Sequence, residues 1–150
     1  MKFLIPFILL LVACSKPAPV ERIAETPSGY PEAVFSGISA KYLSSKFAAR
    51  CISKGFLLEL QTEQKVVCEM PMSQDEIQWA KVFIGNQYSS DFHSYFQYSL
   101  AETSGKIRVQ RREWVQLQMP YGQIRRREQN GPEYFNPLQE LLYEMDGKPI

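Results

Sequence analysis

The sequence has a single histidine, His93, and an almost even balance of charge. One histidine excludes a zinc site built from two or three histidines of the same chain. The 150 residues include 17 basic and 16 acidic side chains, for a net charge of +1. This balance provides no general attraction to nucleic acid, so we expect no nucleic-acid partner.

The usual sequence signals of nucleotide binding and serine hydrolysis are also missing. The chain has no glycine-rich phosphate-binding loop and no Gly-x-Ser-x-Gly elbow. Asn130-Gly131 and Gly122 have the character of turn residues. We therefore expect no cofactor.

A long hydrophobic run is lacking as well. The apolar stretch from Phe3 to Val12, interrupted by Pro6, would rise only about 15 Å as a helix. A bilayer core requires about 20 residues. With the basic Met1-Lys2 in front of it, the stretch is typical of a signal peptide rather than of a transmembrane helix.

The apolar stretch ends in Leu11-Val12-Ala13-Cys14. This quartet resembles the lipobox of bacterial lipoproteins, in which a leucine and two small or branched residues precede the cysteine. The resemblance implies cleavage between Ala13 and Cys14, a diacylglyceryl thioether on Cys14 and acylation of its new amine, for example by palmitate. Several acyl chains give a stable anchor in membrane lipid. The alternative is a short secretory signal followed by a cysteine by chance.

The residue after Cys14 is Ser15. In bacteria with two membranes, an aspartate there commonly retains lipoproteins in the inner membrane. By this analogy Ser15 favours the outer membrane, with the protein facing the periplasm, and exposure at the cell surface is the alternative.

Three segments follow from this division. They are a signal peptide over 1–13, a lipidated proline-rich tether over 14–33 and one α+β domain over 34–150. Proline-rich chain favours an extended, semi-rigid conformation. The alternative is that part of the tether packs on the domain through Tyr30. The tether contains four prolines: Pro17, Pro19, Pro27 and Pro31.

Hydrophobic periodicity in the remaining sequence predicts helices and strands. The second helix has a capping-box sequence, Ser73 followed by Glu76, although its alternating apolar residues leave an irregular strand as the alternative. Ser104-Gly105 predicts a turn between two strands. The predicted helices cover 36–54, 74–83 and 136–146, and the predicted strands cover 56–62, 65–70, 93–100, 107–119 and 121–128.

This order predicts an antiparallel sheet with helices packed on one face. It is similar to the order in helix-grip and related two-layer α+β domains of outer-membrane lipoproteins. These include domains of an accessory lipoprotein of the β-barrel assembly machine. On the strand over 107–119, Arg111 and Glu113 interrupt an otherwise apolar face.

Cys51 and Cys68 remain after the lipobox cysteine is assigned. Because an exported protein meets an oxidising compartment, we expect a disulfide between them. Two buried free thiols are the alternative.

Enzymatic chemistry has few candidate residues. His93 follows Asp91 by two positions, with Ser89, Ser90 and Ser94 nearby, but a lone histidine beside a strand is more often structural. Pairs of carboxylates that cut glycan are the other possibility. We expect no enzyme. The candidate carboxylates are Glu59, Glu69, Asp75, Glu76 and Asp91.

Six arginines fall within a short stretch of two predicted strands. Arginine binds carboxylates and phosphates, so we expect these side chains to bind a partner such as lipid head groups, peptidoglycan or an acidic protein surface. The alternative is a solvated strand face balanced by nearby glutamates. The arginines are Arg108, Arg111, Arg112, Arg125, Arg126 and Arg127.

Together these features predict a non-enzymatic structural or interaction subunit of an envelope assembly or secretion system. It would be anchored in the outer membrane through Cys14 and would contact an envelope protein complex. A hydrolytic lipoprotein that acts on peptidoglycan and a module that binds lipid or glycan are the alternatives.

Overall fold

The centre of the fold is a long β-hairpin, in a computed structural model that describes residues 18–150. Its strands, β4 (Ser90–Thr103) and β5 (Lys106–Gln118), pair antiparallel. Ser104 and Gly105 join them with φ values of 53° and 72°, which are typical of the type I′ turn that suits a twisted hairpin. The turn predicted at this dipeptide is confirmed.

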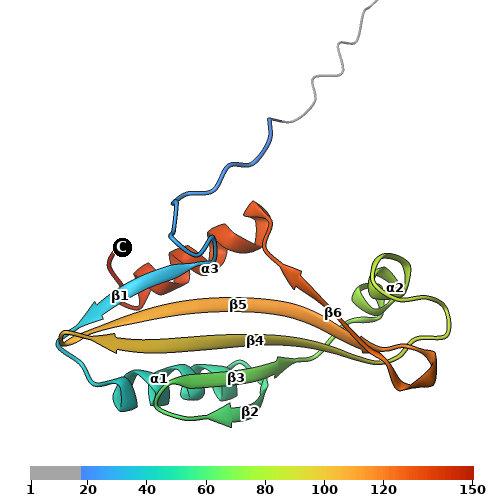
Figure 1. Ribbon diagram of the computed structural model, residues 1–150, viewed down its shortest axis with the longest axis horizontal. Helices are drawn as coiled ribbons and strands as arrows, with labels where there is room; N and C mark the ends of the chain where they lie inside the picture. The colour runs from blue at the N-terminus through green and yellow to red at the C-terminus, as the bar shows by residue number, and fades with distance from the viewer. Residues whose placement is uncertain (1–17) are drawn as a thin grey trace, which may run out of the picture.

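Four further strands complete the antiparallel sheet (Figure 1). On one side, β3 (Lys65–Met70) pairs with β4, and β2 (Leu57–Gln61) forms the edge beyond it. On the other side, β5 has two partners along one edge. β1 (Glu32–Ser36) pairs with its first half and β6 (Ile124–Gln129) with its second half.

Three helices pack on one face of this sheet, as the element order predicts. α1 (Ala40–Ser53) and α3 (Pro132–Glu144) cover the part formed by β1, β3 and the hairpin tip. α2 (Gln74–Phe83) covers the other end, beside β6 (Figure 1). The α+β fold class with an antiparallel sheet is therefore confirmed.

Two separate groups of buried apolar residues hold the helices to the sheet. In the larger group, the ring of Phe47 stacks on that of Tyr98 with 3.9 Å between centroids. The smaller group, beneath α2, contains Ala80, Ile84, Val115 and Leu117. The larger group consists of Ala33, Phe35, Leu43, Phe47, Ala48, Cys51, Val66, Cys68, Phe96, Tyr98, Leu100, Ile107, Val109, Leu142 and Met145.

The capping sequence of α2 forms the contacts that it predicts. The Ser73 hydroxyl accepts a hydrogen bond from the backbone N–H of Glu76, and the Glu76 carboxylate accepts one from the backbone N–H of Ser73. Two N–H groups of the first turn are thereby satisfied. The segment is a helix over the range that we predicted, and the alternative of an irregular strand is wrong.

The first strand and the start of the first helix differ from the prediction. Residues 32–36 form β1, whereas we predicted that a helix begins at Ser36. The helix begins instead at Ala40, after the Ser39 hydroxyl accepts a hydrogen bond from Tyr42 N. β1 is short, and its partner lies seventy or more residues along the chain, at Lys106 to Gln110, so the local pattern does not reveal it.

The last helix and the last strand are also displaced. α3 begins at Pro132 rather than at Asn136, because Gly131 takes the extended N-cap conformation and proline suits the first helical position. A short 3₁₀ turn over Pro120–Gly122 delays the start of β6 to Ile124.

Part of the predicted tether packs on the domain. Arg22 Nη2 donates to the carbonyl of Asn130 at 2.7 Å, and Ile23 N donates to Asn136 Oδ1 at 3.0 Å. The guanidinium of Arg112 lies 4.2 Å from the ring centroid of Tyr30. A tether that extends to residue 33 is therefore too long, and the alternative of packing through Tyr30 is the one observed. Cys14 and the signal peptide over 1–13 lie outside the described residues.

Cys51 on α1 and Cys68 on β3 form the predicted disulfide, with 6.3 Å between their Cα atoms. Both residues are buried in the larger apolar group, so the bond fastens α1 to the sheet. Among residues 18–150, no helix is long and apolar enough to cross a bilayer.

We predict that this disulfide makes a measurable contribution to stability. Its loop of 17 residues corresponds to about 3 kcal/mol in the chain-entropy model. The intact mass measured without reductant should be lower than the reduced mass by two hydrogens. The double variant Cys51→Ala/Cys68→Ala should lose about 3 kcal/mol of unfolding free energy in urea. Two thiols that react with an alkylating agent in the native protein would contradict the prediction.

Candidate functional site

A buried ion pair lies on the helix-facing side of β5, between the two apolar groups. Arg111 is 6% exposed and Glu113 is 8% exposed. Arg111 Nη2 donates to Glu113 Oε1 at 2.5 Å. Because an unpaired buried charge costs several kcal/mol, each member requires the other in this position.

Arg111 is also held by two aromatic rings. Its Nη1 donates to the Tyr98 hydroxyl at 3.0 Å, and its guanidinium carbon lies 4.5 Å from the ring centroid of Phe96. Burial raises the pKa of Tyr98 above its ordinary value, and the positive charge of Arg111 opposes part of that rise. The phenol therefore stays neutral and accepts the hydrogen bond from Arg111 at neutral pH.

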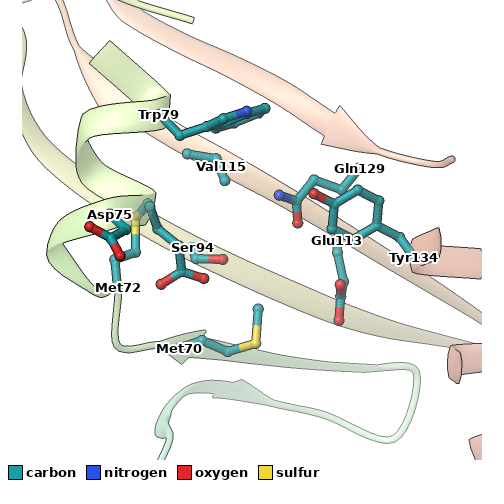
Figure 2. A pocket seen from close by; sticks show the side chains of 10 residues that line it. Met70, Met72, Asp75, Trp79, Ser94, Glu113, Val115, Gln129 and Tyr134 are labelled. Atoms are coloured by element: carbon teal, nitrogen blue, oxygen red, sulfur yellow. The ribbon is translucent and has the colours of Figure 1, made fainter. Parts of the chain in front are cut away.

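A pocket of about 490 Å³ opens beside Glu113, and we call it the acidic pocket (Figure 2). α2 forms one wall and the first turn of α3, with the end of β6, forms the opposite wall. Strands β3, β4 and β5 provide its floor and rim. The lining residues are Met70, Met72, Asp75, Glu76, Trp79, Ser94, Glu113, Val115, Gln129 and Tyr134.

The walls of the acidic pocket combine apolar surface with negative charge. Three of its lining residues are carboxylates and none is a lysine or an arginine. Glu113 uses only Oε1 for Arg111, and its Oε2 has no hydrogen-bond donor within residues 18–150. Ser94 is 8% exposed and also lines the pocket. An apolar group with a cationic end matches this lining in shape and in charge.

Trp79 is held in place at the edge of the pocket by β6. The guanidinium carbon of Arg127 lies 5.5 Å from the centroid of the Trp79 ring, and Nη1 of Arg127 donates to the carbonyl of Phe83. Arg125 donates in the same way to the carbonyl of Ile84. These contacts join β6 to the end of α2, the helix that carries the tryptophan.

The six arginines predicted to bind a partner do not form one cluster. Arg108, Arg112 and Arg126 lie on the face of the sheet away from the helices, whereas Arg111, Arg125 and Arg127 lie on the helix-facing side. Several already have partners within the chain. Arg108 pairs with the buried Glu32, and Arg126 pairs with Glu128 and lies 3.8 Å from the ring centroid of Trp114.

The face away from the helices carries a row of rings. Trp114 is buried between Tyr95, stacked at 5.5 Å, and Arg126. Slight burial, together with the negative charges of Glu69 and Glu59, raises the pKa of Tyr95. This face is therefore polar at its rim and already filled at its centre.

His93 and Ser94, two of the residues considered for catalysis, lie on opposite faces of β4. His93 Nδ1 lies 2.6 Å from Glu69 Oε1, whereas Ser94 points to the opposite face of β4. Asp75 and Glu76 line the acidic pocket, but Glu59, Glu69 and Asp91 do not. Within residues 18–150, no three side chains of the metal-ligating types are placed to hold a metal ion.

Sequence reasoning missed most residues of the acidic pocket. Glu113, Trp79, Ser94 and Tyr134 come from four elements that meet only in the folded chain. One signal was present, because Arg111 and Glu113 are charged at two successive inward positions of an apolar strand face. Buried charges at such positions often mark functional sites.

Comparison of the chain with protein-family models, with curated proteins and with solved structures gives no match.

We predict that Tyr98→Phe lowers stability and changes its dependence on alkaline pH. The variant keeps the ring but removes the acceptor for Arg111, at a cost of about 1–2 kcal/mol at pH 7. The pKa of Tyr98 is higher in the folded protein than in the unfolded chain, where it is near 10. The neutral phenol therefore stabilises the folded state at pH values below 10, and this stabilisation is lost as the pH rises through the pKa of the folded state. In urea unfolding, the free energy of unfolding of Tyr98→Phe should therefore fall less above pH 10 than that of the wild type.

The exposed Tyr88 provides the control for this measurement. Tyr88→Phe should follow the wild-type pH profile. If the stability of Tyr98→Phe also changes with pH in parallel with that of the wild type, the Tyr98 phenol is not responsible for the loss of stability at alkaline pH.

We also predict strong coupling between Arg111 and Glu113. Arg111→Met and Glu113→Leu should each cost about 3–5 kcal/mol, because each leaves the other charge buried and unpaired. The double variant should lose far less unfolding free energy than the two single variants added together, since it leaves no unpaired charge buried at this position. Arg126 and Glu128 have the same spacing on β6, but their side chains are 41% and 33% exposed, so their double-mutant cycle should give about 1 kcal/mol or less. Equal coupling energies for the two pairs would contradict this interpretation.

Proposed function

We propose that this chain is a lipid-anchored protein of the bacterial envelope that binds another envelope protein without chemical reaction. The lipobox at Leu11 to Cys14 supports the anchor, and Ser15 favours the periplasmic face of the outer membrane. The acidic pocket is the observation that carries the binding function, because it joins apolar walls to three carboxylates. Such a protein fits the role of an interaction subunit in an envelope assembly or secretion system.

The lining of the pocket defines the chemistry of the partner. A lysine or arginine side chain has an apolar stem and a cationic head. The stem matches Met70, Met72 and Trp79, and the head matches the open oxygen of Glu113 and the carboxylate of Asp75. We therefore propose a basic segment of a protein as the occupant.

The anchor would restrict where this partner is found. Because Arg22 is bonded to the carbonyl of Asn130, only the residues between Cys14 and Arg22 link lipid to domain. An extended link of eight residues spans at most about 28 Å. The pocket would then sample a layer close to the membrane surface.

The proposal is tested by crosslinking in intact envelopes. A photoreactive residue replaces Met72 at the rim of the pocket, and a matched control replaces Lys46 on the exposed side of α1. Position 72 should capture one dominant envelope protein that position 46 does not. Asp75→Asn should reduce the yield at position 72 by at least threefold, because it removes a carboxylate of the pocket and leaves the buried ion pair intact.

The anchor is tested in the same cells. Mass spectrometry of the wild type should find an acylated Cys14 at the mature N-terminus, and Cys14→Ala should weaken the capture. Identical captures at positions 72 and 46, or recovery of only peptidoglycan fragments and bulk lipoproteins, would overturn the proposed function.

Hydrolysis of peptidoglycan is a second candidate, because Asp75, Glu76 and Glu113 line one pocket. Glycosidases use a pair of carboxylates. Release of soluble fragments from purified peptidoglycan by the wild type, and its loss in Glu113→Gln, would favour this candidate over binding.

A further inference from the structure

A second pocket lies on the other side of the buried ion pair, and we call it the basic pocket. It has a volume of about 290 Å³ and lies between α1 and the end of α3. Arg111 lines this pocket, whereas Glu113 lines the acidic one. The lining residues are Phe47, Arg50, Cys51, Lys54, Phe56, Phe96, Tyr98, Arg111 and Leu141.

The charge of this lining is entirely positive. Arg50, Lys54 and Arg111 are its ionised residues, and no carboxylate is among them. Neither Arg50 nor Lys54 forms an ion pair within residues 18–150. Arg111 is paired with Glu113, whereas Arg50 and Lys54 place two positive charges without a carboxylate partner at the same pocket, and a bound anion would be attracted to them.

Arg111 has hydrogen-bond donors to spare. A guanidinium has five N–H groups, and only two of those of Arg111 are engaged, with Tyr98 and with Glu113. Its Nε–H is buried and has no partner among the described residues. Because the Nε atom has almost no accessible surface, a ligand in the pocket would bind the remaining N–H groups of the guanidinium, which lines the pocket.

The end of α1 does not itself use the positive side chains. The carbonyls of Arg50, Cys51 and Ile52 accept hydrogen bonds from the backbone N–H groups of residues 54–56. The last turn is therefore satisfied without Arg50 or Lys54 as caps. Their side chains are available to a ligand at the mouth of the pocket.

We propose that the basic pocket binds a small carboxylate with an apolar tail. The carboxylate lies between Arg50, Lys54 and Arg111, and the tail lies against the aromatic and aliphatic lining that includes Phe56 and Leu141. A volume of 290 Å³ holds about ten water-sized groups, which suits a chain of about eight carbons. This site is separate from the acidic pocket and does not depend on the function proposed for it.

The test is a calorimetric titration of the full chain carrying Cys14→Ala with sodium octanoate. Octanol and octylamine are matched probes that have the same tail without the negative charge, and octyl phosphate distinguishes a carboxylate site from a general anion site. Octanoate should bind at least tenfold more tightly than octanol, and octylamine should not bind. Tighter binding of octyl phosphate than of octanoate would overturn the choice of carboxylate.

Variants locate the binding in the pocket. Arg50→Gln and Lys54→Gln should each weaken octanoate binding at least threefold, and the double variant about tenfold. Lys46→Gln makes the same charge change elsewhere on α1, and Asp75→Asn alters only the acidic pocket; both should bind as the wild type does. All four residues are outside the apolar core, so thermal unfolding should confirm that each variant is folded.

Three results would overturn the proposal. They are equal affinities for octanoate and octanol, no octanoate binding up to about 10 mM, or a decrease of octanoate affinity in Lys46→Gln as large as that in Lys54→Gln. Because this titration uses neither Met72 nor an envelope partner, its failure leaves the crosslinking test of the acidic pocket intact.

Discussion

The ion pair between Arg111 and Glu113 determines how the helices are arranged over the sheet. These two charges occupy successive inward positions on β5, so an uninterrupted apolar core along that strand is impossible. α1 and α3 pack on the apolar residues before the pair, and α2 packs on those after it. The edge of β5 changes partner at the same place, from β1 to β6. The division of the core and the division of the sheet edge therefore coincide.

Both pockets are consequences of this division. Where helices cannot close over a charged position, the gap above the sheet remains open to solvent. The pocket that Glu113 lines holds two further carboxylates, and the pocket that Arg111 lines holds two further cations. The two pockets therefore border opposite members of one ion pair.

Local sequence patterns predicted those elements whose stability is local or periodic. The capping box at Ser73 specifies the start of α2, and alternation along β5 correctly separates its inward from its outward residues. β1 was missed because a strand of five residues depends on its distant partner β5. The acidic pocket was missed for the same reason, since its lining comes from residues between Met70 and Tyr134 on separate elements. Its trace in the sequence was the charged interruption of an apolar face.

The arginine-rich stretch shows why density along the sequence is a poor guide to a binding surface. Successive residues of a strand point to opposite faces, so Arg125 and Arg127 are directed to α2 while Arg126 lies over Trp114 on the other face. There they join β6 to its neighbours instead of forming a common patch. Charges without an ion-pair partner among residues 18–150 also line the two pockets beside the buried pair, where they lie next to apolar surface. Recognition by this domain is therefore expected in the gaps between its helices rather than on the exposed face of its sheet.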